Sequence, residues 1–387
     1  MRMNETSATI RILVASDSHV GYAERDVIRG RDSINSFNEV MELAKNRDVD
    51  MVLLAGDLFH DSKPSQSSMF EVIRSLRINC LGNKPCEVQV LADDPVIGHD
   101  KDVQHINTQD YHVNVAIPVY SIHGNHDDPS GFGGLCALDI IQAAGLVNYF
   151  GRVPQSNDIT VRPILMQKGT TRLALYGLSN VREERLHQSM RSGKVAFMRP
   201  SLDDTGTVDD SWLNILAVHQ NHHAHSTTNY LPESMIPNWF NLIVWGHEHE
   251  CLIDPVENQE QGFAVCQPGS SVATSLCQGE AQTKHVGILT IKGKDFSMEK
   301  IPLKTVRPFI MKEYRLVDEI DEAQNRTKNG KAQQGKAAVI DFLIRKVDEA
   351  IEEAIDEWLE THQGAELDGE NTTLTRSDCP CRSFVFV

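Results

Sequence analysis

Five apolar segments of this 387-residue sequence are each followed by residues of the types that bind divalent metals. The five polar groups are Asp17-Ser18-His19, Asp57 with His60, Asn125-His126-Asp127, His219, and His247-Glu248-His249. Carboxylate, amide oxygen and imidazole ligands suit Mn²⁺, Fe²⁺ or Zn²⁺, and the set is large enough for two ions. No cysteine joins the set, which argues against a structural zinc site. Each group alone fits an ordinary turn, but their repetition after one apolar segment after another favours a metal centre.

The elements that must position these groups are near-continuously apolar segments. They are residues 10–16, 51–56, 117–123, 172–178, 213–219 and 241–246. Such segments are typical of strands covered on both faces, and helical patterns separate them at 33–46, 66–79 and 135–145. The alternation predicts an α/β fold, in which ligands bind at the carboxyl ends of the strands, so we expect the polar groups to converge. Gly56, Gly124 and Gly246 precede three of the groups, and we expect them to let the backbone turn sharply there.

The chain changes character near residue 305, which predicts two domains. Residues 1–305 carry the strand signals, ending in a hairpin pattern at 284–303. Residues 80–115 form a polar insertion that is longer than most loops of compact domains. Beyond a polar linker, residues 337–361 repeat apolar side chains at three- and four-residue steps, which predicts an amphipathic helix. We expect one domain over 1–305 and a second over 306–387.

Composition narrows the classes of function. The net charge is −17, and residues 348–370 hold ten Asp or Glu and no Lys or Arg. We interpret that block as a solvated face, and charge alone gives no basis for nucleic-acid binding. Bound divalent cations would nevertheless make the local charge at a metal site positive. No run of about 18 apolar residues occurs, which predicts a protein that does not span a membrane.

The order D-x-H, GD, GNHD, H and GHEH resembles the signature of the calcineurin-like metallophosphoesterases. Within that superfamily, "LLAGDLFHDSKPS", "PVYSIHGNHDDPSG" and "NLIVWGHEHEC" resemble the eukaryotic double-strand-break repair nucleases of the meiotic-recombination (Mre/SbcD) type. The text "GDLFHDS" departs from the GD…DRG motif of the phosphatases. The resemblance runs from about residue 10 to about residue 313. It implies a metallophosphoesterase β-sandwich flanked by helices, with a partial, truncated α+β capping domain after it.

The resemblance also implies a role for each polar group. One metal would be held by Asp17, His19, Asp57 and His249, and the other by Asp57, Asn125, His219 and His247. The expected cofactors are two Mn²⁺, with Mg²⁺ or Fe²⁺ as alternatives. His126 would be catalytic, His60 would position the DNA strand, and Tyr22 lies where the family places a residue near the substrate.

The implied activity is hydrolysis of phosphodiester bonds with two metals. The family resemblance predicts a Mn²⁺-dependent 3′–5′ exonuclease on double-stranded DNA and endonuclease on single-stranded DNA. It would process DNA ends in double-strand-break repair and meiosis, in the nucleus. Two alternatives stay open: a phosphatase or phosphodiesterase of the same superfamily, and a catalytically impaired scaffold that binds DNA ends.

The partners implied by the resemblance are DNA ends, a second copy of the chain, and two further subunits. The homodimer would form through the helices near 66–79 and 135–145. The alternative is that the apolar residues of these helices only face the core of their own chain. The insertion at 80–115 would engage an FHA/BRCT adaptor subunit. The docking region for an SMC-like coiled-coil ATPase is expected to be missing. Residues 362–387 do not resemble the strands of the family's capping domain, so a truncation or a gene-model error is expected there.

Overall fold

The computed structural model describes residues 8–91, 106–130, 132–153, 158–201, 207–223, 228–316, 336–362, 375–376 and 379–380. The chain divides into two compact units. The larger unit comprises residues 1–274 and 283–306, and the smaller unit comprises residues 275–282 and 307–387.

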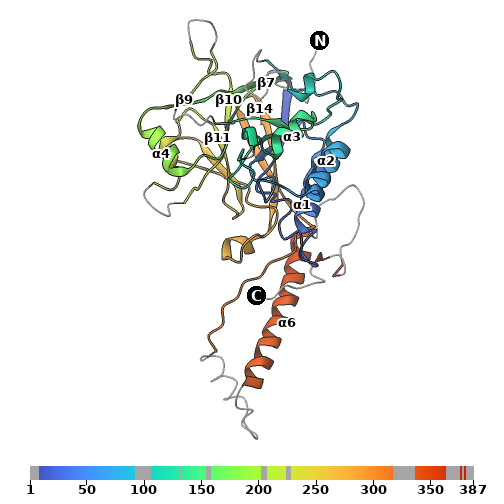
Figure 1. Ribbon diagram of the computed structural model, residues 1–387. Helices are drawn as coiled ribbons and strands as arrows, with labels where there is room; N and C mark the ends of the chain where they lie inside the picture. Colours follow the sequence, from blue (N-terminus) through green and yellow to red (C-terminus); the bar gives the residue numbers. More distant parts are fainter. Residues whose placement is uncertain are drawn as a thin grey trace. The chain divides into compact units, whose positions relative to one another are not determined.

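Two stacked sheets form the centre of the larger unit (Figure 1). The first sheet has the order β15-β14-β1-β2-β4-β5 and the second has the order β12-β13-β11-β10-β8-β7-β3. The strands of the first sheet are β1 (Thr9–Ala15), β2 (Met51–Ala55), β4 (Val119–Ile122), β5 (Asn148–Tyr149), β14 (His285–Lys292) and β15 (Asp295–Pro302). Those of the second are β3 (Gln89–Val90), β7 (Ile164–Lys168), β8 (Thr171–Leu178), β10 (Leu213–His219), β11 (Leu242–Gly246), β12 (Leu252–Glu257) and β13 (Ala264–Gln267). A separate parallel pair consists of β6 (Ile159–Val161) and β9 (Val195–Phe197).

Strand β1 shows why the strand segments are apolar on both faces. Ile10, Ile12 and Val14 belong to the core between the sheets, together with Leu213 of β10. Leu13 belongs instead to the outer core beneath the helices. Successive side chains of a strand point to opposite faces, so a strand buried on both sides is apolar at every fully buried position, as β1 is; its polar residues Thr9 and Arg11 are only half-buried.

Helices cover the outer faces of both sheets. They are α1 (Asp32–Asn46), α2 (Gln66–Cys80) and α3 (Ala137–Ala143) on the first sheet, and α4 (Glu183–Arg191) on the second. Helix α2 begins at Ser65, whose hydroxyl accepts a hydrogen bond from the Ser68 amide at 3.0 Å. This arrangement of helix, sheet, sheet and helix confirms the predicted α/β sandwich flanked by helices.

All six predicted strands, the three predicted helices and the predicted hairpin are present. The sequence analysis did not identify α4 or the strands β3, β5, β6, β7, β9, β12 and β13. Helix α4 buries only Leu186, His187 and Ser189, so its apolar pattern is too sparse to indicate a helix. Strands β3, β5, β6 and β9 have only two or three residues, too few to display a period of two.

Two ion pairs attach the first part of the insertion to the larger unit. Lys168 Nζ lies 2.7 Å from the Asp50 carboxylate and 2.9 Å from that of Glu87. Lys84 pairs with Asp48. The described parts of the predicted insertion are 80–91 and 106–115, and residues 92–105 lie outside the described residues.

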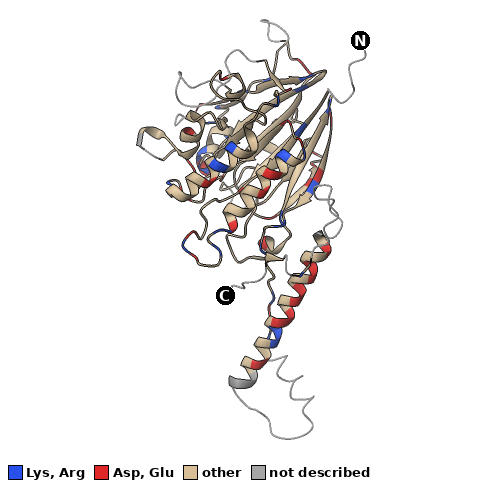
Figure 2. Ribbon diagram, turned by 90° about the vertical axis from the view of Figure 1, so that its right-hand side faces the viewer, with Lys and Arg blue, Asp and Glu red and all other residues tan. Residues whose placement is uncertain are grey.

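Helix α6 (Lys336–His362) is the main element of the smaller unit, and it confirms the predicted amphipathic helix. Trp358 packs in a small cluster with Cys379, and the Arg376 guanidinium lies 2.7 Å from the carboxylates of both Glu352 and Asp356. Figure 2 shows Asp and Glu positions in red along α6. Glu352, Glu353, Asp356 and Glu357 are exposed, in agreement with the solvated acidic face expected there. No described helix, α6 included, is long and apolar enough to cross a membrane.

Candidate metal centre

The loops after β1 and β2 run side by side and bring three predicted ligands together. The Asp17 amide donates to Gly56 O at 3.1 Å, and the His19 amide donates to Asp57 O at 3.0 Å. Asp17, His19 and Asp57 all have left-handed backbone conformations, with φ of 51°, 44° and 48°. Such conformations strain a non-glycine residue and persist only where the surroundings enforce them, which is typical of functional sites.

Close packing, more than turning, explains two of the three glycines in the motifs. A Cβ atom on Gly124 would lie 2.0 Å from Asp57 Oδ1, and one on Gly246 would lie 2.1 Å from Ala55 O. Neither glycine has a positive φ, whereas Gly56 has a φ of 100°. The expectation of a sharp turn is therefore right for Gly56 and wrong for Gly124 and Gly246, where only the absent side chain allows the strand ends to approach.

One group of candidate ligands consists of Asp17, His19 and His249. The two imidazole Nε2 atoms lie 3.1 Å apart, and they lie 3.9 Å (His19) and 3.8 Å (His249) from Asp17 Oδ1. These three atoms face one point, as ligands of a single ion would.

A second group consists of Asp57, His219 and His247, with Asn125 beside them. Asp57 Oδ2 lies 3.4 Å from His219 Nε2, and Asn125 Oδ1 lies 3.3 Å from the same nitrogen and 2.9 Å from His247 Nδ1. Asp57 Oδ2 also lies 3.8 Å from His19 Nε2 of the first group. Asp57 is thus placed between the two groups, and all seven predicted metal ligands converge.

The chemistry of these side chains fits divalent cations. Asp17 Oδ1 and Asp57 Oδ2 are buried and have no hydrogen-bond partner among the described residues, an arrangement that is costly unless a cation compensates it. Burial lowers the pKa of His19 well below its usual value and that of His247 to about 4, so both imidazoles present a lone pair at neutral pH. Burial also opposes a proton on His219, but the carboxylates of Asp57 and Asp17 raise its pKa to about 10. A divalent cation would take the place of that proton.

Three of the candidate ligand histidines each have an oxygen atom next to the ring nitrogen that faces away from the other candidate ligands. His219 Nδ1 lies 2.8 Å from Ala55 O, His249 Nδ1 lies 2.9 Å from Thr274 Oγ1, and His247 Nε2 lies 2.6 Å from Asn221 Oδ1. Outer partners of this kind fix the tautomer and the ring orientation of a metal ligand. Sequence reasoning missed Asn221 and Thr274 because neither belongs to a recognisable motif.

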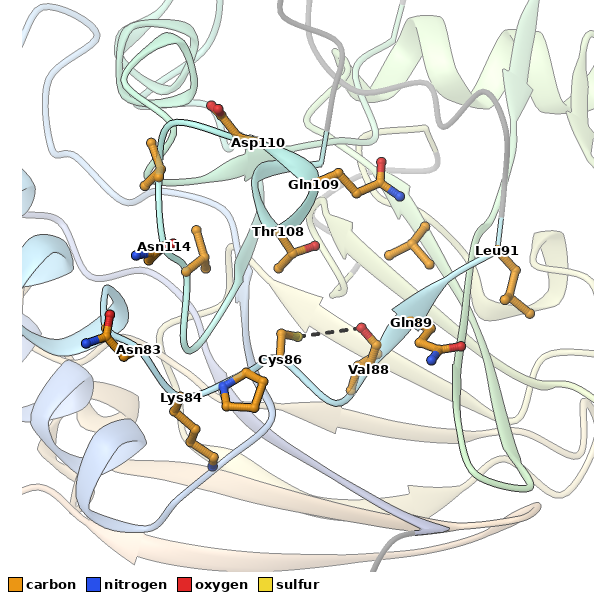
Figure 3. A pocket seen from close by; sticks show the side chains of 15 residues that line it. Asn83, Lys84, Cys86, Val88, Gln89, Leu91, Thr108, Gln109, Asp110 and Asn114 are labelled. Atoms are coloured by element: carbon orange, nitrogen blue, oxygen red, sulfur yellow. Dashed lines mark hydrogen bonds between the residues drawn. The ribbon is translucent and has the colours of Figure 1, made fainter.

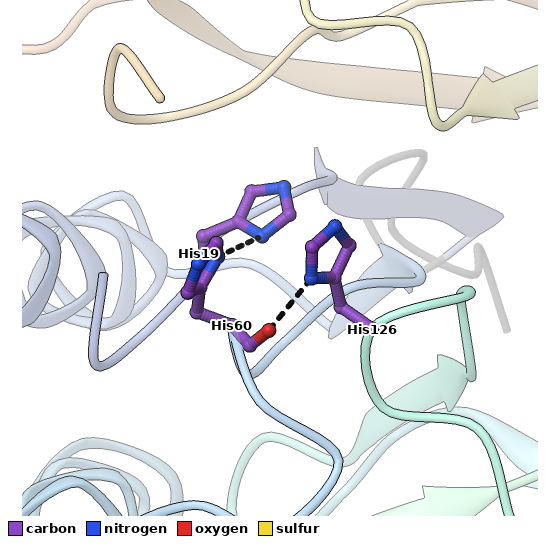
Figure 4. A group of neighbouring side chains, drawn as sticks. All are labelled: His19, His60 and His126. Carbon is purple, nitrogen blue, oxygen red and sulfur yellow. Dashed lines mark hydrogen bonds between the residues drawn. The ribbon is translucent and has the colours of Figure 1, made fainter. Parts of the chain in front are cut away.

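His60 and His126 lie beside the first group (Figure 4). His126 Nδ1 donates to His60 O at 2.6 Å, so Nε2 is the ring nitrogen of His126 that this hydrogen bond does not use. His60 Nδ1 lies 3.4 Å from His19 Nδ1. The Tyr22 ring contacts the His60 ring edge-on at 5.0 Å, and its hydroxyl donates to Thr274 O at 2.8 Å. The structure therefore places His60, His126 and Tyr22 beside the candidate metal ligands.

The polar stretch after His219 predicts that His222, His223 and His225 are loop residues. His222 and His223 lie in the loop after β10, and His225 lies outside the described residues. The His222 ring stacks on Trp245 at 4.1 Å, and its Nε2 lies 2.8 Å from Glu233 Oε1. This histidine packs on the outer side of the second sheet and is not among the metal-binding groups of the described residues.

Comparison with known proteins places the chain in a family. The model of the calcineurin-like phosphoesterases matches residues 10–251, which is more than half of the sequence. The chain belongs to this family. The match covers every predicted metal ligand of the phosphoesterase and confirms the resemblance to its superfamily. A second model, described as a presumed DNA-binding domain of Mre11, matches residues 296–376.

The phosphoesterase is also similar to curated double-strand break repair proteins. It is 55% identical over 354 residues to the protein mus-23 of Neurospora crassa, covering 92% of this chain and 46% of that protein. It is 44% identical over 356 residues to MRE11 of Homo sapiens, covering 92% of this chain and 49% of that protein. It is 47% identical over 326 residues to MRE11 of Arabidopsis thaliana, covering 83% and 45%. The chain spans about half the length of the curated relatives it matches.

Proposed function

We propose that this chain is a divalent-metal-dependent nuclease that processes DNA ends in double-strand-break repair. The observation that carries the proposal is the pair of candidate ligand groups with Asp57 placed between them. Its expected activities are a 3′–5′ exonuclease on double-stranded DNA and an endonuclease on single-stranded DNA, with Mn²⁺ as the activating ion. The names of the relatives and the match to a presumed DNA-binding domain support DNA as the substrate.

The ligand assignments belong to the same proposal. Asp17, His19, Asp57 and His249 would hold one ion, and Asp57, Asn125, His219 and His247 would hold the other. Two divalent cations, when bound, would supply positive charge where negative charge builds on the phosphoryl oxygens. The strained conformations and the packed glycines described above support these assignments, because they hold the ligands in place before an ion arrives.

His126 would act on the leaving group. Its Nδ1 donates to His60 O, so Nε2 is the nitrogen that can face a phosphodiester. Water would supply the hydroxyl that joins phosphorus and would release its other proton to the solvent. The bond between phosphorus and the 3′ oxygen would break, and Nε2 would deliver a proton to that oxygen. The His60 ring, stacked on His126 at 4.9 Å and held by Tyr22, would position the DNA strand.

The homodimer is proposed to form through helices α2 and α3. Some apolar residues of these helices face the core, as Val72 and Leu138 do. Others are exposed: Phe70 of α2 by 63% and Ile140 of α3 by 57%, and Leu135, which precedes α3, is exposed by 45%. Large apolar side chains that stay exposed can belong to an interaction surface, and a second copy of the chain is the partner that the resemblance implies.

The adaptor subunit is proposed to bind the insertion. Its described parts line a pocket of about 590 Å³ between Gly82–Leu91 and Thr108–Val115 (Figure 3). Asn83, Gln89 and Asn114 give this pocket polar groups that a peptide backbone can use. A nuclear location, a role in meiosis and a coiled-coil ATPase subunit of the SMC type belong to the proposal through the resemblance alone.

The decisive test is digestion of end-labelled double-stranded and single-stranded DNA by the purified chain with Mn²⁺, beside the same reaction after chelation. Cleavage that needs Mn²⁺ supports the nuclease. Hydrolysis of a small phosphomonoester without cleavage of DNA would favour a phosphatase. Binding of two ions and of DNA ends without any cleavage would favour the scaffold.

A further inference from the structure

We propose that Asn221 and Glu183 are positioning residues that orient His247 toward the second group of metal ligands. Asn221 would hold the proton of His247 on Nε2, and Glu183 would hold the amide of Asn221 in the orientation that this requires. The inference rests on the metal centre of the proposed function and extends it to two residues of the loop after β10 and of helix α4.

The contacts form a chain from helix α4 to the candidate metal ligand. His247 Nε2 lies 2.6 Å from Asn221 Oδ1, while His247 Nδ1 lies 2.9 Å from Asn125 Oδ1. Asn221 Nδ2 donates to Glu183 Oε1 at 3.2 Å and to Asn229 O at 3.1 Å. The Asn221 side chain therefore uses both ends of its amide at the same time.

The two acceptors settle which way the amide faces. A side-chain amide can be flipped without changing its shape, so its neighbours must decide between oxygen and nitrogen. The Glu183 carboxylate and the Asn229 carbonyl only accept hydrogen bonds, so the donor Nδ2 must face them. Oδ1 must then face His247 and can only accept, which places the imidazole proton on Nε2. The lone pair of Nδ1 is thereby directed toward Asn125 and Asp57.

Further contacts hold the loop that carries Asn221. The Glu248 carboxylate accepts hydrogen bonds from the amides of His222 at 2.8 Å and His223 at 3.3 Å. The Leu231 amide donates to Asn221 O at 2.9 Å. Asn221 is fixed at its backbone as well as at its side chain, so it can act as a rigid support.

His247 depends on side chains in a way that His219 does not. The outer nitrogen of His219 faces a backbone carbonyl, Ala55 O, which no substitution removes. The outer nitrogen of His247 faces the amide of a side chain, which a substitution can remove. His247 also has a left-handed backbone with a φ of 85°, so its ring direction is not secured by a regular strand. Loss of such an outer partner typically costs 10- to 100-fold in metal affinity.

Calorimetric titration of the chelator-treated chain with Mn²⁺ tests the inference without relying on activity. The wild-type chain should bind two equivalents. Asn221→Ala should bind one equivalent with unchanged affinity and the other about 10- to 100-fold more weakly. DNA cleavage by this variant should recover as the Mn²⁺ concentration is raised, because a positioning residue does not take part in the reaction itself.

Two substitutions at Glu183 separate orientation from folding. Glu183→Gln keeps an oxygen that accepts from Asn221 Nδ2 and should retain near-wild-type binding. Glu183→Ala removes that acceptor and should weaken the same single equivalent, though less than Asn221→Ala because Asn229 O remains. His223→Ala removes an exposed imidazole from the same loop and is the matched control.

The outcomes distinguish this inference from the proposed function. If Asn221→Ala binds both equivalents as tightly as wild type, or weakens both equally, the inference is overturned while the metal centre stands. If Asn221→Ala does not fold, equal Mn²⁺ affinities of Glu183→Ala and Glu183→Gln overturn the inference. A wild-type chain that binds fewer than two equivalents overturns the metal centre and the inference together.

Discussion

The Asp127 carboxylate accepts a hydrogen bond from the Leu58 amide at 2.8 Å and thereby ties the loop after β2 to the loop after β4. It also accepts from the Phe59 amide at 3.4 Å and from the Gly124 amide at 2.7 Å. Asp127 is completely buried. One carboxylate therefore fixes the two loops that carry the candidate ligands Asp57 and Asn125.

Replacing Asp127 by alanine should strongly destabilise the fold. The change leaves buried amide donors without an acceptor, and each costs about 1–3 kcal/mol. We expect a loss of more than about 3 kcal/mol in the free energy of unfolding, measured by urea denaturation. The control is the neighbouring change Asp128→Ala, which removes no described side-chain hydrogen bond. Its free energy of unfolding should stay within about 0.5 kcal/mol of wild type. Equal stability of the two variants would refute the role of Asp127.

Replacing His126 by asparagine should separate catalysis from metal binding. The variant loses the nitrogen proposed to protonate the leaving oxygen, so cleavage of DNA should fall by at least about 100-fold. Its Mn²⁺ content should remain that of wild type, because His126 belongs to neither proposed ligand set. His112→Asn, at an exposed histidine of the insertion, should cleave normally. Loss of both ions from His126→Asn would contradict the assignment.

Removing divalent metal should lower the stability of the larger unit. Asp17 Oδ1 and Asp57 Oδ2 are buried without hydrogen-bond partners among the described residues, and a bound cation compensates both. Free Mn²⁺ at 100 times its dissociation constant should stabilise the folded state by about 2.7 kcal/mol for each site. Thermal unfolding should therefore shift upward with Mn²⁺ and return with chelator. Asp57→Ala should abolish the shift, and a shift that survives this change would place the ions elsewhere.

Charged substitutions on helices α2 and α3 should convert a dimer into a monomer. Phe70→Glu and Ile140→Glu each replace an exposed apolar side chain that the proposed interface would bury. Burying such a side chain is worth about 1.5–3 kcal/mol and is lost twice in a symmetric dimer. Light scattering should show the dissociation constant rising by about 100-fold or more. Val256→Glu, on an exposed residue of β12, is the control, and a dimer that survives both helix changes would exclude this surface.

The sequence by itself determined the long central strands and which residues are the candidate metal ligands. Strands such as β1 and β10 are buried on both faces, so most of their positions are apolar, and this signal is visible without any knowledge of neighbours. The carboxyl ends of parallel strands meet at one edge of a sheet, which is why Asp17 and Asn125, from the first sheet, could be expected together although they are far apart in the chain. His219 comes from the second sheet, and only the stacking of the two sheets brings it to the same place.

Only the tertiary structure decided how each ligand is held. Asn221, Thr274 and Asp127 act through hydrogen bonds to residues distant in sequence, and a polar residue carries no periodic signal of such a partner. The same holds for Gly124, whose missing Cβ matters because Asp57 from another loop occupies that space. The type of a candidate ligand is a property of one residue, so the sequence shows it. Tautomer, ring direction and close approach depend on pairs of residues that come into contact only when the chain has folded.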